Sequence, residues 1–349
     1  MGTTWSRIFD RMDRRTMPIA SLAVLTAVVC LATAAAAQPA TPAKPADAAP
    51  PPAYVEQEIT IPSGALQLPG TLCLPAKRSG KVPLVVMVPG SGPQDRDETI
   101  GPNKPFRDIA HGLAAAGIAT LRYDRRTRVV PPHSLVPAEI TLDWEVTDDA
   151  VAALQFAAKL PEADPASLYL LGHSLGGTMA PYIAGRFASL RGVVLLAPGI
   201  RPIFEVLHDQ AVRLKDQGAT EEQLKAVLAI QQTLFDKAKD PNAPGTEVVA
   251  GAPLAYWRDW NARRPAEEWK KLRLPVLVLQ GGKDVQISKA DYDLLAASLP
   301  KERGEFHWLA NDNHLFMPSS GAGLREYSTA GHVDPEVVSL IAAWVKRQR

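Results

Sequence analysis

The sequence has very little cysteine and almost no net charge, and each shortage excludes a class of protein. Its 349 residues include two cysteines, Cys30 and Cys73, which are too few for a cysteine-based zinc site or a disulfide framework. Lysine and arginine total 38 against 37 for aspartate and glutamate, so the formal net charge is +1. This balance gives no general attraction to nucleic acid or to an acidic polymer. Any function must therefore come from a local site.

Apolar side chains, by contrast, are plentiful. Hydrophobic residues make up 46% of the chain and charged residues 21%, which is enough to bury a sizeable core and excludes a disordered tail or a collagen-like rod. Cys73 lies in a predicted strand with no histidine near it in sequence, so we interpret it as a buried, inert thiol.

The first 37 residues have the pattern of a secretory signal peptide. Four arginines between positions 7 and 15 precede an apolar run that ends in Ala35-Ala36-Ala37. We predict cleavage after Ala37 and a periplasmic or secreted mature protein without stable membrane insertion. The alternative is an uncleaved membrane anchor, because the run is nearly long enough to span a bilayer.

The remaining chain divides into a linker and one α/β domain. Residues 38–53 are almost entirely Pro, Ala, Thr, Lys and Asp, which predicts a flexible tether. From residue 54 to residue 349, short apolar runs alternate with helical patterns, which indicates a mostly parallel, doubly wound sheet. The expected buried strands are 83–88, 119–123, 167–171, 192–196 and 275–279, with an antiparallel edge hairpin at 57–61 and 68–74. The expected helices are 106–116, 148–159 and one that begins near Met179 and ends near 188.

One interval is too long for an ordinary loop. About 70 residues separate the strand ending near Ala197 from the strand opening at Pro275, and insertions of this length are usually lids or subdomains. Helical periodicity predicts a mainly helical cap over about residues 200–272. Within it, Tyr256, Trp257 and Trp260 share one helical face. They could line an acyl pocket or pack the cap onto the body, and both interpretations stay open.

A serine stands between a predicted buried strand and a predicted helix. The sequence Gly172-His-Ser-Leu-Gly-Gly177 matches the Gly-x-Ser-x-Gly pattern of a nucleophile elbow, in which a tight turn exposes Ser174. Glycine two residues to either side avoids clashes with the neighbouring strand and helix. The pentapeptide alone is a weak signal, and its place between strand and helix gives it weight.

A serine nucleophile needs a base and an acid that orients the base. Asp284 follows the strand 275–279, and His314 follows the next strand, 305–309, so both lie at the carboxyl ends of strands in the order Ser, acid, His. We predict Ser174, Asp284 and His314 as a catalytic triad. His307 and His332 are rivals for the base, and a structural role fits each of them better. Asp312 lies two residues before the predicted base, and such a close neighbour in sequence rarely faces the ring nitrogen.

The oxyanion of the tetrahedral intermediate needs preorganised backbone N–H donors. We predict Leu175, directly after the nucleophile, as one donor. The second should come from the loop after the strand 83–88, where we favour Ser91 and keep Gly92 as the alternative.

With these motifs, the chain resembles serine hydrolases of the α/β-hydrolase superfamily, and within it exported bacterial carboxylesterases near the S33-type serine aminopeptidases. Besides the elbow, the resemblance rests on blocks at 90–97, 121–126, 313–316, 326–327 and 331–334. It implies the fold, the same triad, and hydrolysis of a small-molecule ester with no cofactor and no metal. The chain departs from the family pattern at Glu98-Thr99 and at Arg126-Thr127, both in loops near the expected site.

Two other functions remain open. The same triad could serve a peptidase, aminopeptidase or amidase, because amides and esters share the acyl-enzyme route. A non-catalytic binding protein on the same scaffold should lack a triad member, and none is missing from this sequence.

Overall fold

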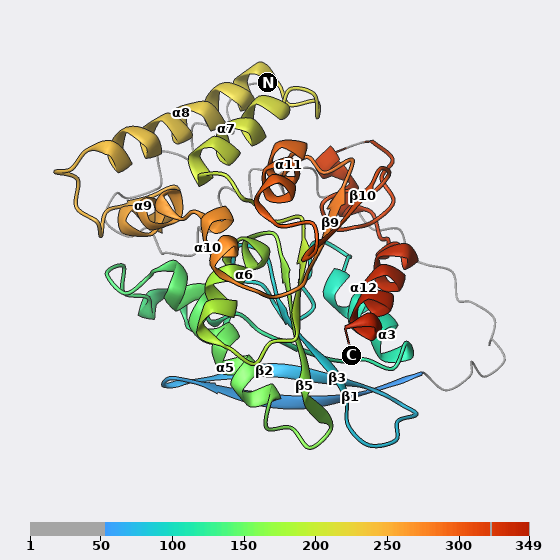
Figure 1. Cartoon of the computed structure of the whole chain (residues 1–349). Coiled ribbons are helices and arrows are strands. Elements are labelled where there is room, and N and C mark those ends of the chain that lie inside the picture. The colour runs from blue at the N-terminus through green and yellow to red at the C-terminus, as the bar shows by residue number, and fades with distance from the viewer. Residues whose placement is uncertain (1–52, 322, 349) are drawn as a thin grey trace, which may run out of the picture.

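The computed structural model describes residues 53–321 and 323–348 (Figure 1). The predicted signal peptide and all of the predicted linker except residue 53 lie outside this range. No helix within the range is long and apolar enough to cross a membrane.

An eight-stranded sheet forms the centre of the fold, in the order β1-β2-β4-β3-β5-β6-β9-β10. The first two strands form an antiparallel hairpin, β2 is also antiparallel to β4, and the remaining pairs are parallel, as predicted for an α/β protein. The strands are Tyr54–Ser63 (β1), Leu66–Pro75 (β2), Val82–Val88 (β3), Ala119–Tyr123 (β4), Ala163–His173 (β5), Gly192–Leu196 (β6), Val276–Gly281 (β9) and Gly304–Leu309 (β10). All residues of β3, β4, β6 and β9 are buried, which explains their continuous rather than alternating hydrophobicity.

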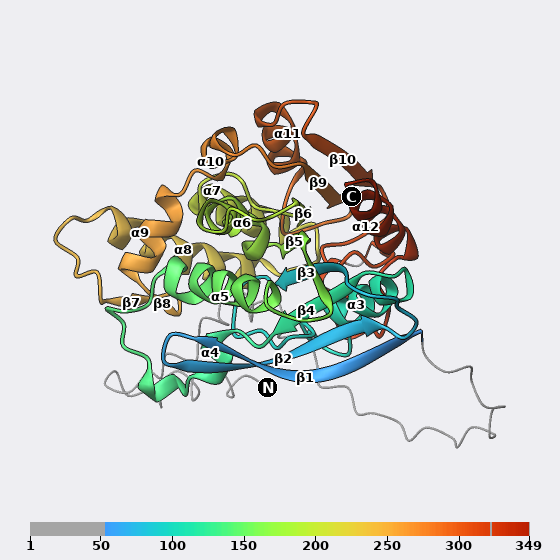
Figure 2. The same ribbon diagram turned by 60° about the horizontal axis from the view of Figure 1, so that its bottom comes forward.

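Helices cover both faces of the sheet (Figures 1 and 2). The two that pack together on one face are α3 (Pro105–Ala115) and α12 (Pro335–Arg347), and the other face carries α5 (Asp148–Ala157) and α6 (Leu175–Arg186). The other helical segments of the body are α4 (Arg126–Val129), η1 (Pro132–Ser134), η2 (Asp143–Thr147), α11 (Lys289–Ser298) and η3 (Gly323–Ser328).

The predicted start of α6 is wrong by four residues. The helix begins at Leu175, directly after the predicted nucleophile, and not near Met179. Gly176 and Gly177 have poor helix propensity, so the sequence of the first turn is typical of a loop. Close packing requires glycine at position 176 in spite of that propensity, because a Cβ there would lie 2.2 Å from the Val88 carbonyl oxygen.

The long insertion between β6 and β9 is mainly helical, as predicted. Its elements are α7 (Ile203–Arg213), α8 (Glu221–Lys239), the short strands β7 (Val248–Val249) and β8 (Ala252–Pro253), α9 (Leu254–Ala262) and α10 (Pro265–Lys271). Figure 1 shows α7, α8 and α9 beyond the carboxyl ends of the parallel strands, so the insertion covers the edge of the sheet where sites form in such folds. Gln231 of α8 donates to the Leu207 carbonyl of α7 at 2.7 Å, which ties the two helices together.

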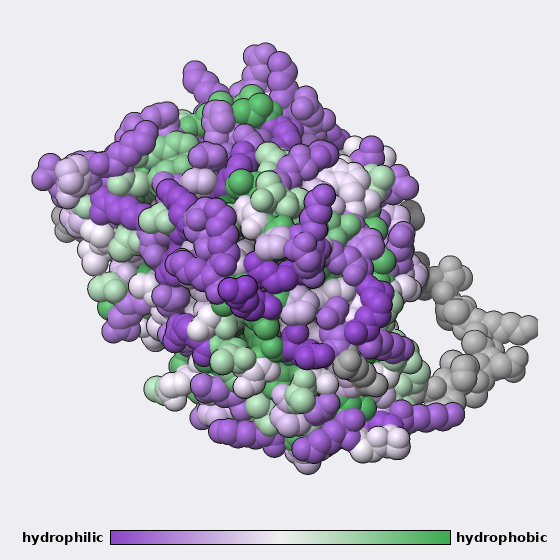
Figure 3. Space-filling view, viewed as in Figure 1, coloured by the Kyte–Doolittle hydropathy of each residue, from purple (hydrophilic) through white to green (hydrophobic). Residues whose placement is uncertain are grey.

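Polar side chains dominate one face of the molecule (Figure 3), and Cys73 lies in the buried core. Figure 3 shows hydrophilic side chains over most of one face, with hydrophobic side chains in small groups between them. Cys73 is fully buried, and burial together with the nearby Glu56 carboxylate raises the pKa of its thiol to about 11. Cys73 is therefore an inert core thiol, in agreement with the sequence interpretation.

Candidate active site

The loop between β5 and α6 holds Ser174 in a strained conformation. Its φ is +51° and its ψ is −115°, which a residue with a side chain rarely adopts. The flanking glycines are required by contact: a Cβ on Gly172 would lie 2.4 Å from the Gly176 carbonyl oxygen. The tight turn presents Ser174 to a cavity beneath the cap.

The loops after β9 and β10 bring Asp284 and His314 together. Both side chains are buried, and the Nδ1 atom of His314 lies 2.7 Å from the Oδ2 atom of Asp284. The other carboxylate oxygen accepts the backbone N–H groups of Gln286 at 2.7 Å and Ile287 at 2.9 Å. Burial alone would raise the pKa of Asp284, but His314 and the two amide donors outweigh it and lower that pKa. An ionised Asp284 fixes the Nδ1–H tautomer of His314 and leaves its Nε2 atom free to accept a proton.

His173, directly before Ser174 in the chain, connects the elbow to the loop that carries His314. The His173 ring lies 4.6 Å from the His314 ring, centroid to centroid, and its Nε2 atom is 2.9 Å from the His314 carbonyl oxygen. Among the described residues, no hydrogen bond joins the Ser174 hydroxyl to His314. Such bonds are often long before substrate binds and shorten in the complex.

The rival residues have other partners. His307 pairs with Glu305 at 2.9 Å on the edge strand β10, and His332 pairs with Asp108 at 3.0 Å with 81% of its side chain exposed. Asp312 is buried, and burial together with Asp334 and Glu336 raises the pKa of its carboxyl to about 6. The carboxylate that contacts His314 is that of Asp284.

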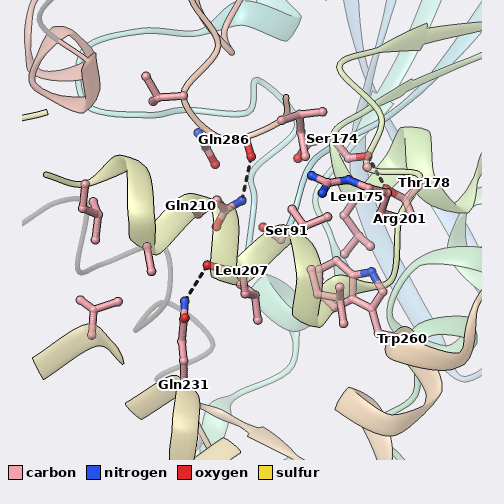
Figure 4. Close-up of a pocket in the computed structure, with 18 of the residues that line it drawn as sticks. Ser91, Ser174, Leu175, Thr178, Arg201, Leu207, Gln210, Gln231, Trp260 and Gln286 are labelled. Atoms are coloured by element: carbon pink, nitrogen blue, oxygen red, sulfur yellow. Dashed lines mark hydrogen bonds between the residues drawn. The ribbon is translucent and has the colours of Figure 1, made fainter. Parts of the chain in front are cut away.

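Both favoured oxyanion donors lie on the same cavity as Ser174 (Figure 4). Leu175 is the first residue of α6, so its N–H is one of the groups that a helix leaves without an intrahelical acceptor. Ser91 follows Gly90 in the loop after β3 and lines the cavity wall. Gly92 has a φ of +93° and is not among the lining residues.

Two buried side chains that sequence reasoning missed hold the loop that carries the expected oxyanion donor. The Oε1 atom of Glu98 accepts the Gly90 N–H at 2.5 Å, and the Nη2 atom of Arg125 donates to the Pro89 carbonyl at 2.5 Å. The available signals were indirect: Glu98 stood out as a departure from the family pattern, and Arg125 lies in a block that carried the resemblance.

The predicted aromatic residues of α9 both line the cavity and pack the cap. Tyr256, Trp257 and Trp260 all belong to the cavity wall. The Trp257 indole N–H donates to the Val249 carbonyl at 2.8 Å, and its ring is parallel to that of Trp260, with centroids 5.9 Å apart. Trp260 is less buried than the other two. Further apolar lining from the cap comes from Ile203, Val206, Leu207, Ala211, Leu214, Val227 and Ile230.

Comparisons with known proteins agree with the fold. Residues 85–326 match the model described as the alpha/beta hydrolase family. The chain is 38% identical over 303 residues to Esterase EstD of Thermotoga maritima, a match that covers 86% of this chain and 69% of that protein. Among solved structures, Est1E from Butyrivibrio proteoclasticus has a TM-score of 0.57 at 18% identity, over 83% of this chain and 98% of that chain. The esterase domain of a Rhodothermus marinus protein has a TM-score of 0.52 at 17% identity, over 84% of this chain and 98% of that chain.

Proposed function

The chain belongs to the alpha/beta hydrolase family and is a carboxylic ester hydrolase, and on that premise we propose that it cleaves its substrate through Ser174, His314 and Asp284. The observation that carries this proposal is the buried 2.7 Å contact between His314 and Asp284, together with a strained elbow that presents Ser174 to a largely apolar cavity. A serine, a histidine and a buried carboxylate are the nucleophile, base and acid that this chemistry requires.

In the proposed reaction, the Ser174 hydroxyl oxygen attacks the ester carbonyl while the Nε2 atom of His314 takes its proton. The tetrahedral oxyanion accepts hydrogen bonds from the backbone N–H groups of Leu175 and Ser91. The C–O bond to the alcohol then breaks, and His314 returns the proton to the leaving alkoxide. A water molecule, deprotonated by His314, then attacks the acyl carbonyl. The bond from the acyl carbon to the Ser174 oxygen breaks, His314 returns the proton to that oxygen, and the acid is released. Asp284 stays ionised and stabilises the imidazolium form of His314 in both halves of the reaction.

The cavity supports an apolar acyl group as the bound portion of the substrate. Its walls between the cap and the body are mostly aliphatic and aromatic, and the Trp260 ring is the least buried of its three aromatic residues. Apolar walls favour an uncharged chain or ring, because burying a charge there without a partner would be costly.

The rival function is amide hydrolysis by the same triad. Amines leave poorly unless they are protonated at the right moment, so an enzyme built for esters turns over the matched amide much more slowly. We expect kcat/KM on a p-nitrophenyl ester to exceed that on the p-nitroanilide of the same acid by about 10²-fold or more. Equal rates, or a preference for an aminoacyl anilide, would favour the peptidase.

We further propose that residues 1–37 are a signal peptide, that residues 38–53 are a flexible tether, and that the mature enzyme works in the periplasm or outside the cell. The basic start, apolar run and small residues before Gln38 support this proposal. The test is cell fractionation followed by N-terminal sequencing. A mature chain that begins at Gln38 in the exported fraction is expected, whereas an intact N-terminus in the cytosol or membrane fraction would contradict export.

A further inference from the structure

Glu98 is a buried carboxylate in an unfavourable backbone conformation. Its φ is +53°, and 1% of its surface is exposed. Its Oε1 atom accepts the Gly90 N–H at 2.5 Å and faces the Nδ1 atom of His173 at 2.8 Å, while its Oε2 atom is buried without a hydrogen-bond partner among the described residues. A positive φ and a half-satisfied buried carboxylate each cost free energy, so the placement indicates a functional constraint.

The hydrogen-bond pattern indicates where protons lie around the His173 ring. Its Nε2 atom lies 2.9 Å from the His314 carbonyl oxygen, which can only accept, so Nε2 carries a proton. Its Nδ1 atom faces Glu98 Oε1, which already accepts the Gly90 N–H. A bare Nδ1 lone pair facing a carboxylate would be repulsive, so a further proton lies between these two atoms.

The surroundings of His173 favour the form in which both ring nitrogens hold a proton. Burial disfavours the charged ring, but the Glu98 carboxylate, the His314 carbonyl and the more distant Asp284 outweigh it, and the pKa of His173 is raised. The titratable groups that face the ring are Glu98, Asp284 and His314, and its other ring neighbours are Phe106 and Phe316.

We propose that the His173 imidazolium and the Glu98 carboxylate form a positioning pair that joins the oxyanion loop to the loop bearing the catalytic base, and that turnover requires the proton held between them. The inference rests on the proposed function of Ser174 and His314. Glu98 holds Gly90, next to the expected oxyanion donor Ser91. His173 holds the backbone of His314. The pair therefore sets the distance between the two groups that act on the substrate carbonyl.

The substitution Glu98→Gln is a sharp test of the carboxylate, because glutamine has the same shape without the charge. If the new amide oxygen accepts from Gly90 and from Nδ1–H of a neutral His173, the bare Nε2 then faces the His314 carbonyl. If the new amide NH₂ group instead donates to Nδ1, the Gly90 N–H loses its acceptor. Neither arrangement satisfies all three contacts.

We expect Glu98→Gln to lower kcat by about 10- to 100-fold with KM changed by less than about threefold, because small displacements of catalytic groups have effects of this size. The alkaline limb of the kcat profile should move to lower pH, because without the carboxylate His173 loses its proton more readily. The matched control is Asp149→Asn, which breaks a buried carboxylate pair with Arg126 and Ser63 away from the cavity. It should lower the melting temperature and leave kcat and the pH profile unchanged. A Glu98→Gln enzyme with the wild-type kcat and profile would overturn the proposal.

A second measurement needs no variant. In ¹⁵N-histidine-labelled wild-type protein at pH 7, NMR should show protons on both ring nitrogens of His173, assigned through contacts to Phe106 and Phe316. An Nδ1 atom without a proton would overturn the inference. Labelling of Ser174 by a fluorophosphonate in the same sample tests the proposed nucleophile separately from the proposed Glu98–His173 pair. The probe reports on the nucleophile whether or not the pair is charged.

Discussion

The Tyr256 hydroxyl donates a 2.6 Å hydrogen bond to the Oε2 atom of Glu145. The other carboxylate oxygen of Glu145 pairs with Arg125 at 3.3 Å, and Arg125 donates to the Pro89 carbonyl. This buried chain links an aromatic residue of the cap to the loop that carries the expected oxyanion donor. The position of the cap and the shape of the site are therefore coupled.

Tyr256→Phe tests that link with little change in the cavity wall. The substitution keeps the ring and leaves Glu145 with one fewer donor, so we expect the free energy of unfolding to fall by about 1–3 kcal/mol. Turnover should fall several-fold while the ranking of acyl-chain lengths stays the same. Chemical denaturation and kinetics on graded p-nitrophenyl esters measure both effects. Unchanged stability would show that the hydrogen bond contributes little.

We expect substitutions of the two tryptophans of α9 to have different effects. Trp260→Ala removes the more exposed ring from the cavity, and we expect it to change the relative kcat/KM of long and short acyl chains by about tenfold, the size of one or two lost methylene contacts. Trp257→Ala should instead cost about 3–5 kcal/mol of stability, because its ring is buried and its N–H is bonded to Val249. Melting curves and chain-length profiles of the two variants distinguish the loss of a substrate contact from a loss of stability. The reverse assignment of effects would exclude Trp260 as a substrate contact.

Local sequence patterns predict some parts of the site and miss others, for a physical reason. Asp284 and His314 could be proposed because each follows a strand of the parallel sheet, and parallel strands bring such positions to one edge. Glu98 could not be placed, because it contacts Gly90 in the loop after β3 and His173 at the end of β5, and only His173 reaches the loop after β10. The start of α6 was misplaced for a similar reason, since close backbone packing decides it and local propensity opposes it. Local patterns specify elements, whereas contacts between distant loops depend on the assembled fold.

The proposed triad should show strongly non-additive losses. We expect His314→Ala to lower turnover on the order of 10⁴- to 10⁶-fold and Asp284→Asn somewhat less, because the latter keeps an imidazole in the wrong tautomer. The double variant should stay near the His314→Ala level. His332→Ala and Asp312→Asn serve as controls and should remain within about tenfold of wild type. Turnover of one short-chain ester, with circular dichroism as the check on folding, is the measurement. A collapse in His332→Ala alone would move the base to that position.

Asp312 should make stability depend on pH in a defined window. Its carboxyl pKa is raised from 3.8 to about 6 in the folded protein, so the folded state binds more protons than the unfolded state between these values. Stability is therefore lost as the pH rises from about 4 to about 6, and the loss is constant above that. Asp312→Asn should be more stable than wild type above about pH 6 and equal to it below about pH 4, as measured by chemical denaturation across this range. A difference in stability that does not vary with pH would contradict a raised carboxyl pKa as its cause.

The identity of the nucleophile is the central claim, and a fluorophosphonate probe tests it most directly. The probe forms a covalent bond to an activated serine and places its phosphoryl oxygen where the oxyanion would lie. Peptide mass spectrometry of the labelled protein should find the adduct on Ser174, and Ser174→Ala should take up no probe and have no esterase activity above background. Labelling at another residue, or equal labelling and turnover in Ser174→Ala, would contradict the proposed mechanism.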